Sequence, residues 1–131
     1  MTTTYDIRPL SGSTDFRGIK ITTTASPGDT IHTAQVSATL PDLVTIDVVN
    51  RDSVPRPVIV QFGGTTSPDD YITAIVLPSV TQRICTQKPI RNSLVVKCFS
   101  PGGGIAWADG VTYLGTANVL VVHGHVQRQL T

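Results

Sequence analysis

The most distinctive candidate for chemistry is a pair of histidines, His123 and His125, separated only by Gly124. Side chains two residues apart in a strand point to the same side of a sheet, so both imidazoles would emerge together. That spacing can form one edge of a zinc or nickel site, with His32 as a possible third ligand, but the sequence names no complete ligand set. We therefore expect no metal and interpret the pair as capping a sheet face or lining a subunit interface.

Two loops could hold an ion or a phosphate. Asp69 and Asp70 could begin a calcium loop, but such loops carry several oxygen ligands at regular intervals, and a turn opened by Pro68 also explains the segment. The glycines at 102–104 could cradle a phosphate, yet no Lys followed by Ser or Thr comes next and no helix is predicted there. We expect a flexible loop and no cofactor.

The residue sets that hydrolases need are not recognisable. No Gly-x-Ser-x-Gly turn occurs, and spacing singles out no pair among the nine aspartates as the two carboxylates of a glycosidase. Tyr71, Trp107 and Tyr113 could stack on a sugar, as in a lectin, but they do not recur regularly, so core packing or an interface is the preferred interpretation. We predict that the protein is not an enzyme.

The composition predicts an all-β fold. The chain contains 19 Thr, 16 Val and 11 Ile, and these β-branched side chains fit a pleated sheet better than a helix. Good helix formers are scarce, with no Glu and three Lys. The 11 Gly and 9 Pro indicate many turns.

Alternation of apolar and polar residues locates the strands. Val44, Ile46 and Val48, for example, would share one face of a strand, while Thr45 and Asp47 point the other way. Turn signals recur between these stretches, so we predict a single β-sandwich, jelly-roll-like in its connections, with a closed barrel as the alternative. The predicted strands are 19–25, 30–36, 43–50, 57–62, 71–77, 81–86, 94–99 and 117–127.

The length of 131 residues allows one domain. Residues 1–17 are polar and aperiodic, so we predict an extended N-terminal arm followed by a sandwich domain at 18–131. The apolar and basic side chains of the arm have no evident place in the core, so we expect them at an interface. The candidate interface residues, with the histidine pair, are Tyr5, Ile7, Arg8, Phe16, His123 and His125.

Charge and hydropathy exclude two classes of partner. The net charge is +1 and the arginines form no run, so we expect no direct contact with nucleic acid. No apolar stretch approaches the ~20 residues that span a bilayer, and the N-terminus lacks the features of a secretion signal, so we expect retention in the cytosol of the producing cell.

Cys85 and Cys98 alternate with apolar neighbours, which favours buried thiols over a disulfide.

Several stretches together resemble the small virion structural proteins of tailed bacteriophages that decorate or cement the capsid. They are residues 17–34 (RGIKITTTASPGDTIHTA), 48–53 (VVNRDS), 58–70 (VIVQFGGTTSPDD) and 118–126 (NVLVVHGHV). The resemblance covers about half of the chain and includes no catalytic motif. It implies a β-sandwich or jelly-roll domain that assembles as a homotrimer on the major capsid protein and opposes the pressure of packed DNA.

The expected function is therefore capsid decoration, at the outer surface of a virion made in the host cytoplasm. Two alternatives stay open. One is another virion component, such as a head–tail connector, tail or fibre-base protein. The other is a carbohydrate-binding β-sandwich that uses Trp107 or Tyr113.

Overall fold

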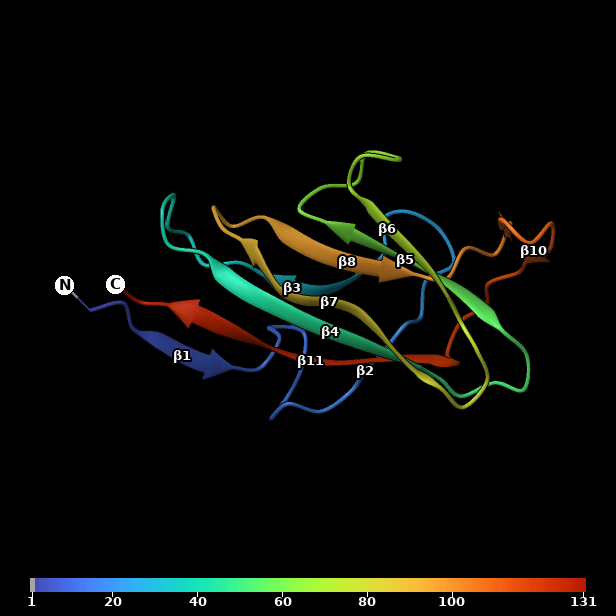
Figure 1. The fold of residues 1–131 in the computed structure, drawn as a ribbon, viewed down its shortest axis with the longest axis horizontal. Coiled ribbons are helices and arrows are strands. Elements are labelled where there is room, and N and C mark those ends of the chain that lie inside the picture. The colour runs from blue at the N-terminus through green and yellow to red at the C-terminus, as the bar shows by residue number, and fades with distance from the viewer. Residues whose placement is uncertain (1) are drawn as a thin grey trace.

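The computed structural model describes residues 2–131, which form two antiparallel sheets packed face to face and a small two-stranded sheet at one end (Figure 1). The all-β prediction and the β-sandwich are confirmed. No helix long and apolar enough to cross a membrane occurs between residues 2 and 131.

The first sheet contains five strands in the order β1–β11–β4–β7, with β2 as a second partner of β11. β1 pairs with the C-terminal part of β11 and β2 with its N-terminal part, so two short segments complete one edge of the sheet. These strands are β1 (Tyr5–Arg8), β2 (Ile19–Lys20), β4 (Asp42–Asn50), β7 (Thr81–Ile90) and β11 (Leu120–Gln129).

The second sheet contains four strands in the order β3–β8–β5–β6, and the small sheet is the hairpin β9–β10. Every strand pairing among residues 2–131 is antiparallel. These strands are β3 (Asp29–Thr33), β5 (Arg56–Phe62), β6 (Tyr71–Val76), β8 (Val95–Phe99), β9 (Ile105–Ala106) and β10 (Thr112–Tyr113).

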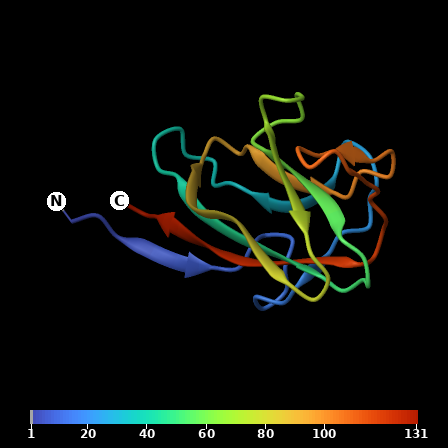
Figure 2. The same cartoon turned by 45° about the vertical axis from the view of Figure 1, so that its right-hand side comes forward.

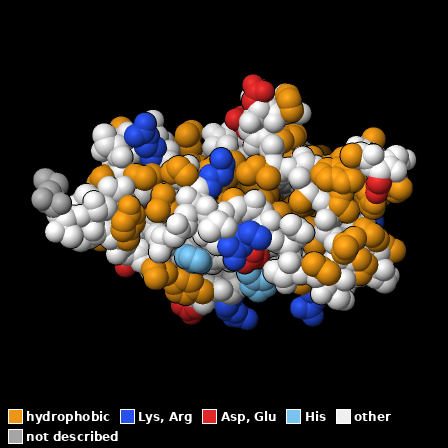
Figure 3. Space-filling view, in the orientation of Figure 1, with side chains coloured by type: hydrophobic (Ala, Val, Ile, Leu, Met, Phe, Trp, Pro, Cys, Tyr) orange, Lys and Arg blue, Asp and Glu red, His pale blue; other side chains and the backbone are white. Residues whose placement is uncertain are grey.

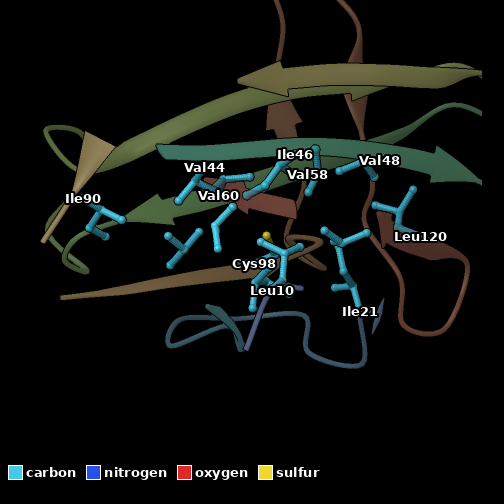
Figure 4. Close-up of a cluster of buried hydrophobic side chains, with 14 of the residues drawn as sticks. Leu10, Ile21, Val44, Ile46, Val48, Val58, Val60, Ile90, Cys98 and Leu120 are labelled. Carbon is cyan, nitrogen blue, oxygen red and sulfur yellow. The ribbon is translucent and has the colours of Figure 1, made fainter. Parts of the chain in front are cut away.

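The core lies between the two sheets and consists mainly of β-branched side chains (Figure 4). Val44, Ile46 and Val48 of β4 point inward as predicted and face Val58 and Val60 of β5. Burying one such side chain contributes about 1.5–3 kcal/mol relative to leaving it exposed. Alternation along the strands is therefore sufficient to form the sandwich without a disulfide, and both cysteines are free thiols.

The N-terminal segment that we expected to lie outside the core is extended, but it is part of the sandwich. Tyr5–Arg8 hydrogen-bonds to β11, and Leu10 is only 1% exposed and joins the core. The edge of β11 offers backbone partners to this segment, and a single apolar side chain anchors it. β1 forms the edge of the sheet beside the end of β11, which is flanked on its other side by β4, and the two chain ends lie at the same end of the molecule (Figure 2).

Three further differences from the expected pattern have local causes. Alternation along β5 points Gln61 away from the core, but residues 26–28 cover it and it bonds to Gly28 and Ser26. Regular alternation would point His32 away from the core, opposite to Ile31, yet both are buried because β3 contains an irregularity between residues 30 and 32. β7 continues through Pro89, which an edge strand tolerates.

Candidate functional site

Four of the six predicted interface residues lie on the outer face of the five-stranded sheet. His123 and His125 are on the same side of β11, and the cross-strand pairs Ile7–Gln127 and Tyr5–Gln129 continue that side onto β1. Ile7 is 63% and Tyr5 50% exposed. We name these four residues, Tyr5, Ile7, His123 and His125, the β1–β11 surface.

The other two predicted interface residues lie elsewhere. Arg8 is opposite Val126, on the other side of the ribbon, and forms an exposed ion pair with Asp6 at 2.7 Å. Phe16 is about half exposed in the loop between β1 and β2. The structure therefore brings the tyrosine, the isoleucine and the two histidines onto one face, whereas Arg8 lies on the other side of β1.

The histidine pair has cross-strand neighbours on β4, where His123 faces Asp47 and His125 faces Thr45. Asp47 is paired with Arg83, and Figure 3 shows Arg, Asp and His side chains together on this face. His32, the possible third metal ligand, is buried between the sheets. In residues 2–131 no group of three or more His, Cys, Asp or Glu side chains could hold a metal ion.

The densest polar arrangement is a buried cluster that we did not predict, formed by His32 on β3, Asp42 on β4 and Arg128 on β11. His32 Nε2 lies 2.7 Å from Asp42 Oδ2. Arg128 donates to the same carboxylate through Nε at 2.8 Å and Nη2 at 2.9 Å. The backbone N–H of Gln35 donates to Asp42 Oδ2 as well, at 3.2 Å. The cluster therefore ties the two sheets together at one end of the sandwich.

The N-terminal segment completes this cluster. The backbone N–H of Ser11 donates to His32 Nδ1 at 3.0 Å, so this nitrogen carries no proton. Nε2 then carries the proton and donates to the Asp42 carboxylate. Both ring nitrogens of His32 are thus occupied, and the imidazole is held as one neutral tautomer.

The two ionisable partners have shifted pKa values. Burial lowers the pKa of His32 below its ordinary value, more than the hydrogen bond and charge of Asp42 raise it. Burial alone would raise the pKa of Asp42, but hydrogen bonds from Arg128 and His32 outweigh it and hold that pKa below its ordinary value. The native cluster therefore contains neutral His32 and an ionised Asp42–Arg128 pair.

Ser11, His32 and Asp42 have the composition of a catalytic triad but not its geometry. The Ser11 hydroxyl oxygen accepts the backbone N–H of Thr33 at 2.7 Å, and Ser11 meets the imidazole through its backbone N–H. A serine hydrolase needs the hydroxyl on one ring nitrogen and the carboxylate on the other. The arrangement is suited to holding chain segments together and does not activate a nucleophile.

The aromatic residues that could stack on a sugar are divided between two places. Tyr71 packs edge-on against Phe99, with ring centroids 6.0 Å apart. Trp107 and Tyr113 belong to the β9–β10 hairpin, where the Tyr113 hydroxyl donates to Asp109 at 2.6 Å. Only Trp107 and Tyr113 could therefore act together.

The two loops considered for ions are closed by their own backbone contacts. Asp70 accepts the N–H of Thr66 through its carboxylate, and the amide of Asp70 donates to the Thr66 carbonyl oxygen. In the glycine loop, Gly104 donates to the carbonyl oxygen of Pro101. Both segments are turns.

A second set of exposed apolar side chains lies at the opposite end of the molecule from the termini, on the loops after β4 and β6 and on the β9–β10 hairpin (Figure 1). Arg56 joins two of these segments by donating to the carbonyl oxygen of Leu114 at 2.8 Å. The set consists of Val54, Leu77, Val80, Trp107, Val111 and Leu114.

The fold and these surfaces define a class of protein, a two-sheet antiparallel β-sandwich with apolar side chains exposed at both ends. No protein-family model, no curated protein and no solved structure matches the chain.

The histidine pair was visible in the sequence, but the buried cluster was not. His32 and Asp42 are ten residues apart and Asp42 and Arg128 are 86 apart, so no local motif joins them. The one usable signal was a charged residue at the first position of the apolar strand that begins at Asp42. Charged side chains are almost never fully buried unless they are paired.

Proposed function

We propose that this chain is a capsid decoration protein of a tailed bacteriophage, which binds the outer surface of the head and stabilises it. The observation that carries the proposal is the β1–β11 surface, where Tyr5 and Ile7 are exposed on an edge strand of the sandwich. Apolar side chains in this position gain free energy when a partner covers them.

The strand order supports a jelly roll as the form of the sandwich. We count β1 and β2 as one interrupted strand and leave out the small β9–β10 hairpin. The main strands one to eight are then β1 with β2, β3, β4, β5, β6, β7, β8 and β11. The first sheet then has the order 1-8-3-6 and the second 2-7-4-5. An eight-stranded double sheet made of two Greek keys follows this plan.

A role in adhesion rather than catalysis agrees with the surface chemistry. The depression lined by Pro41, Pro89, Ile90 and Leu94 contains one charged side chain, Arg91, and no carboxylate or imidazole. Ser11 meets the imidazole of the buried His32–Asp42 pair through its backbone N–H, while its hydroxyl oxygen accepts the N–H of Thr33. We therefore propose that the protein is not an enzyme and that its partners are the major capsid protein and further copies of itself.

The test is binding to expanded heads that lack the protein. Wild-type protein should bind stoichiometrically and raise the temperature at which the heads open. Ile7→Asp should bind less, because a charge would be desolvated at the contact. Val36→Asp is the matched control, since Val36 is 80% exposed in the loop after β3, away from the β1–β11 surface. Heads that bind no wild-type protein would refute the proposal.

The oligomeric state is a separate part of the proposal. Both sheets end in edge strands, among them β6 and β7, and a homotrimer would cover some of these edges. Sedimentation equilibrium should give three times the chain mass of 13.9 kDa. If wild-type protein binds intact particles only at the neck or tail in immunolabelling, another virion component becomes the correct assignment.

The exposed Trp107, on the same hairpin as Tyr113, favours a second candidate, a carbohydrate-binding module. Aromatic faces of this kind stack on sugar rings. A glycan array should then show saturable binding that Trp107→Ala abolishes, whereas Val54→Ala leaves it unchanged. An array without hits removes this candidate.

A further inference from the structure

Four contacts hold residues 10–12 against the sandwich, and one of them is the N–H of Thr33 donating to Ser11 Oγ at 2.7 Å. The side chain of Leu10 is buried in the core. The N–H of Ser11 donates to His32 Nδ1 at 3.0 Å, and the N–H of Gly12 donates to the carbonyl oxygen of Ile31 at 2.9 Å. Among these, only the contact to His32 involves a group that titrates near neutral pH.

The hydrogen-bond directions around His32 leave no place for a second proton. Asp42 accepts from Nε2, and the Ser11 N–H needs the lone pair on Nδ1. A proton on Nδ1 would set two donors against each other across the present 3.0 Å contact. Turning the ring does not help, since both nitrogens of an imidazolium are donors and His32 is 1% exposed.

The charged groups around His32 are Asp42 from β4 and Arg128 from β11. The residue paired with His32 on β8 is Val96, which is apolar, and the N-terminal segment contributes the uncharged Ser11 amide. Arg128 already neutralises Asp42, so a protonated His32 would leave one uncompensated positive charge in a buried cluster. Such a charge is costly.

We propose that His32 is an acid-sensitive latch for the N-terminal segment: protonation of Nδ1 breaks its bond to Ser11 and releases residues 9–13 from the sandwich. The inference depends on the geometry of the cluster and not on the proposed function. Because Tyr5 and Ile7 precede these residues on the same segment, release would also loosen the β1–β11 surface.

The direction in which pH changes the population of the open state follows from the two pKa values of His32. Burial lowers the pKa of His32 in the closed state, while in the open state the ring is hydrated and titrates near its ordinary value of about 6.5. Protons therefore bind the open state preferentially. The population of the open state should be constant above about pH 6.5 and rise by up to about tenfold per pH unit below it.

Amide hydrogen exchange of the full chain tests the latch between pH 7.5 and 5.0. Protection factors, corrected for the intrinsic pH dependence of exchange, should fall below pH 6.5 for the amides of Ser11, Gly12 and Thr33. Amides of the central strand β5 should keep theirs. A flat profile at Ser11 and Gly12 would overturn the proposal, and so would a parallel loss at all amides, which means global unfolding.

Two variants sharpen the test. His32→Asn offers a non-titrating oxygen near the position of Nδ1, so its Ser11 and Gly12 protection should not depend on pH. If this variant keeps the wild-type pH dependence, the latch is refuted. Leu10→Ala leaves the cluster intact and should raise opening at every pH without moving the onset near pH 6.5. NMR titration of the wild-type imidazoles should show His32 titrating together with the loss of protection, and separate titration would also overturn the assignment.

Discussion

Asp42 on β4 and Arg128 on β11 lie directly opposite each other in the five-stranded sheet and form a two-point ion pair. The carboxylate is completely buried, and His32 of the other sheet donates to it as well. One aspartate thus connects both layers of the sandwich, and its charge is acceptable there because Arg128 compensates it.

Replacing Arg128 with Ala should destabilise the fold by about 3–5 kcal/mol, because Asp42 would remain as an unpaired buried charge. Urea unfolding at pH 7.5 measures the change. Arg8→Ala is the control: its pair with Asp6 is nearly half exposed, and such a pair contributes about 0–1 kcal/mol. Equal effects of the two substitutions would contradict the assigned role of Asp42.

The free energy of unfolding should depend on pH through His32 and Asp42. The unfolded chain binds a proton on His32 near pH 6.5, whereas the pKa of His32 in the folded protein is lower. Stability should therefore be constant above about pH 6.5 and fall by up to about 1.4 kcal/mol per pH unit below it.

Asp42 adds a second loss at more acidic pH, because its folded pKa is also below the ordinary value of about 3.9. Its contribution is present above that value and disappears as the pH falls through the folded pKa. Urea titrations at pH 8, 6, 5 and 4 would reveal the first phase. A free energy of unfolding that rises as the pH is lowered from 6.5 to 5 would contradict this expectation.

Leu10→Ala tests whether the N-terminal segment belongs to the core. The side chain is buried, so its truncation should cost about 2–5 kcal/mol. Ile7→Ala removes an exposed side chain from the same segment and should change stability by at most about 0.5 kcal/mol. Thermal unfolding of both variants measures these changes. If Leu10→Ala leaves the stability unchanged, residues 1–17 are an independent arm.

Gly124 separates the two histidines because a larger residue does not fit. A Cβ there would collide with the carbonyl oxygen of Thr45 in the neighbouring strand. Gly124→Ala should therefore destabilise the protein by about 1–3 kcal/mol. Gly103→Ala is the matched control, since a Cβ at Gly103 meets nothing within 4 Å, and circular dichroism melts should separate the two variants clearly.

Both cysteines should react slowly in the native state. Burial raises the pKa of Cys85 and, more strongly, that of Cys98, so little thiolate is available at pH 8. An aromatic disulfide reagent should label both thiols only in denaturant. Rapid labelling of native Cys98 would show that the core opens easily.

The sequence by itself determined most of the main strands of this protein. Alternation placed Val44, Ile46 and Val48 on the buried face of one strand, and turn signals between the alternating stretches separated the strands. It also placed His123 and His125 on one side of β11. These features are local, because a strand repeats every two residues and a turn needs only a few.

Only the tertiary structure decided which elements meet. Tyr5–Arg8 alternates apolar and polar side chains, but its apolar side chains stay exposed, and its place as a strand depends on the edge that β11 presents to it. His32 and Asp42 are buried because Arg128 compensates the charge from across the sheet. Pairing and charge compensation depend on distances in space, and residues 86 positions apart in the chain become neighbours only when the sandwich closes.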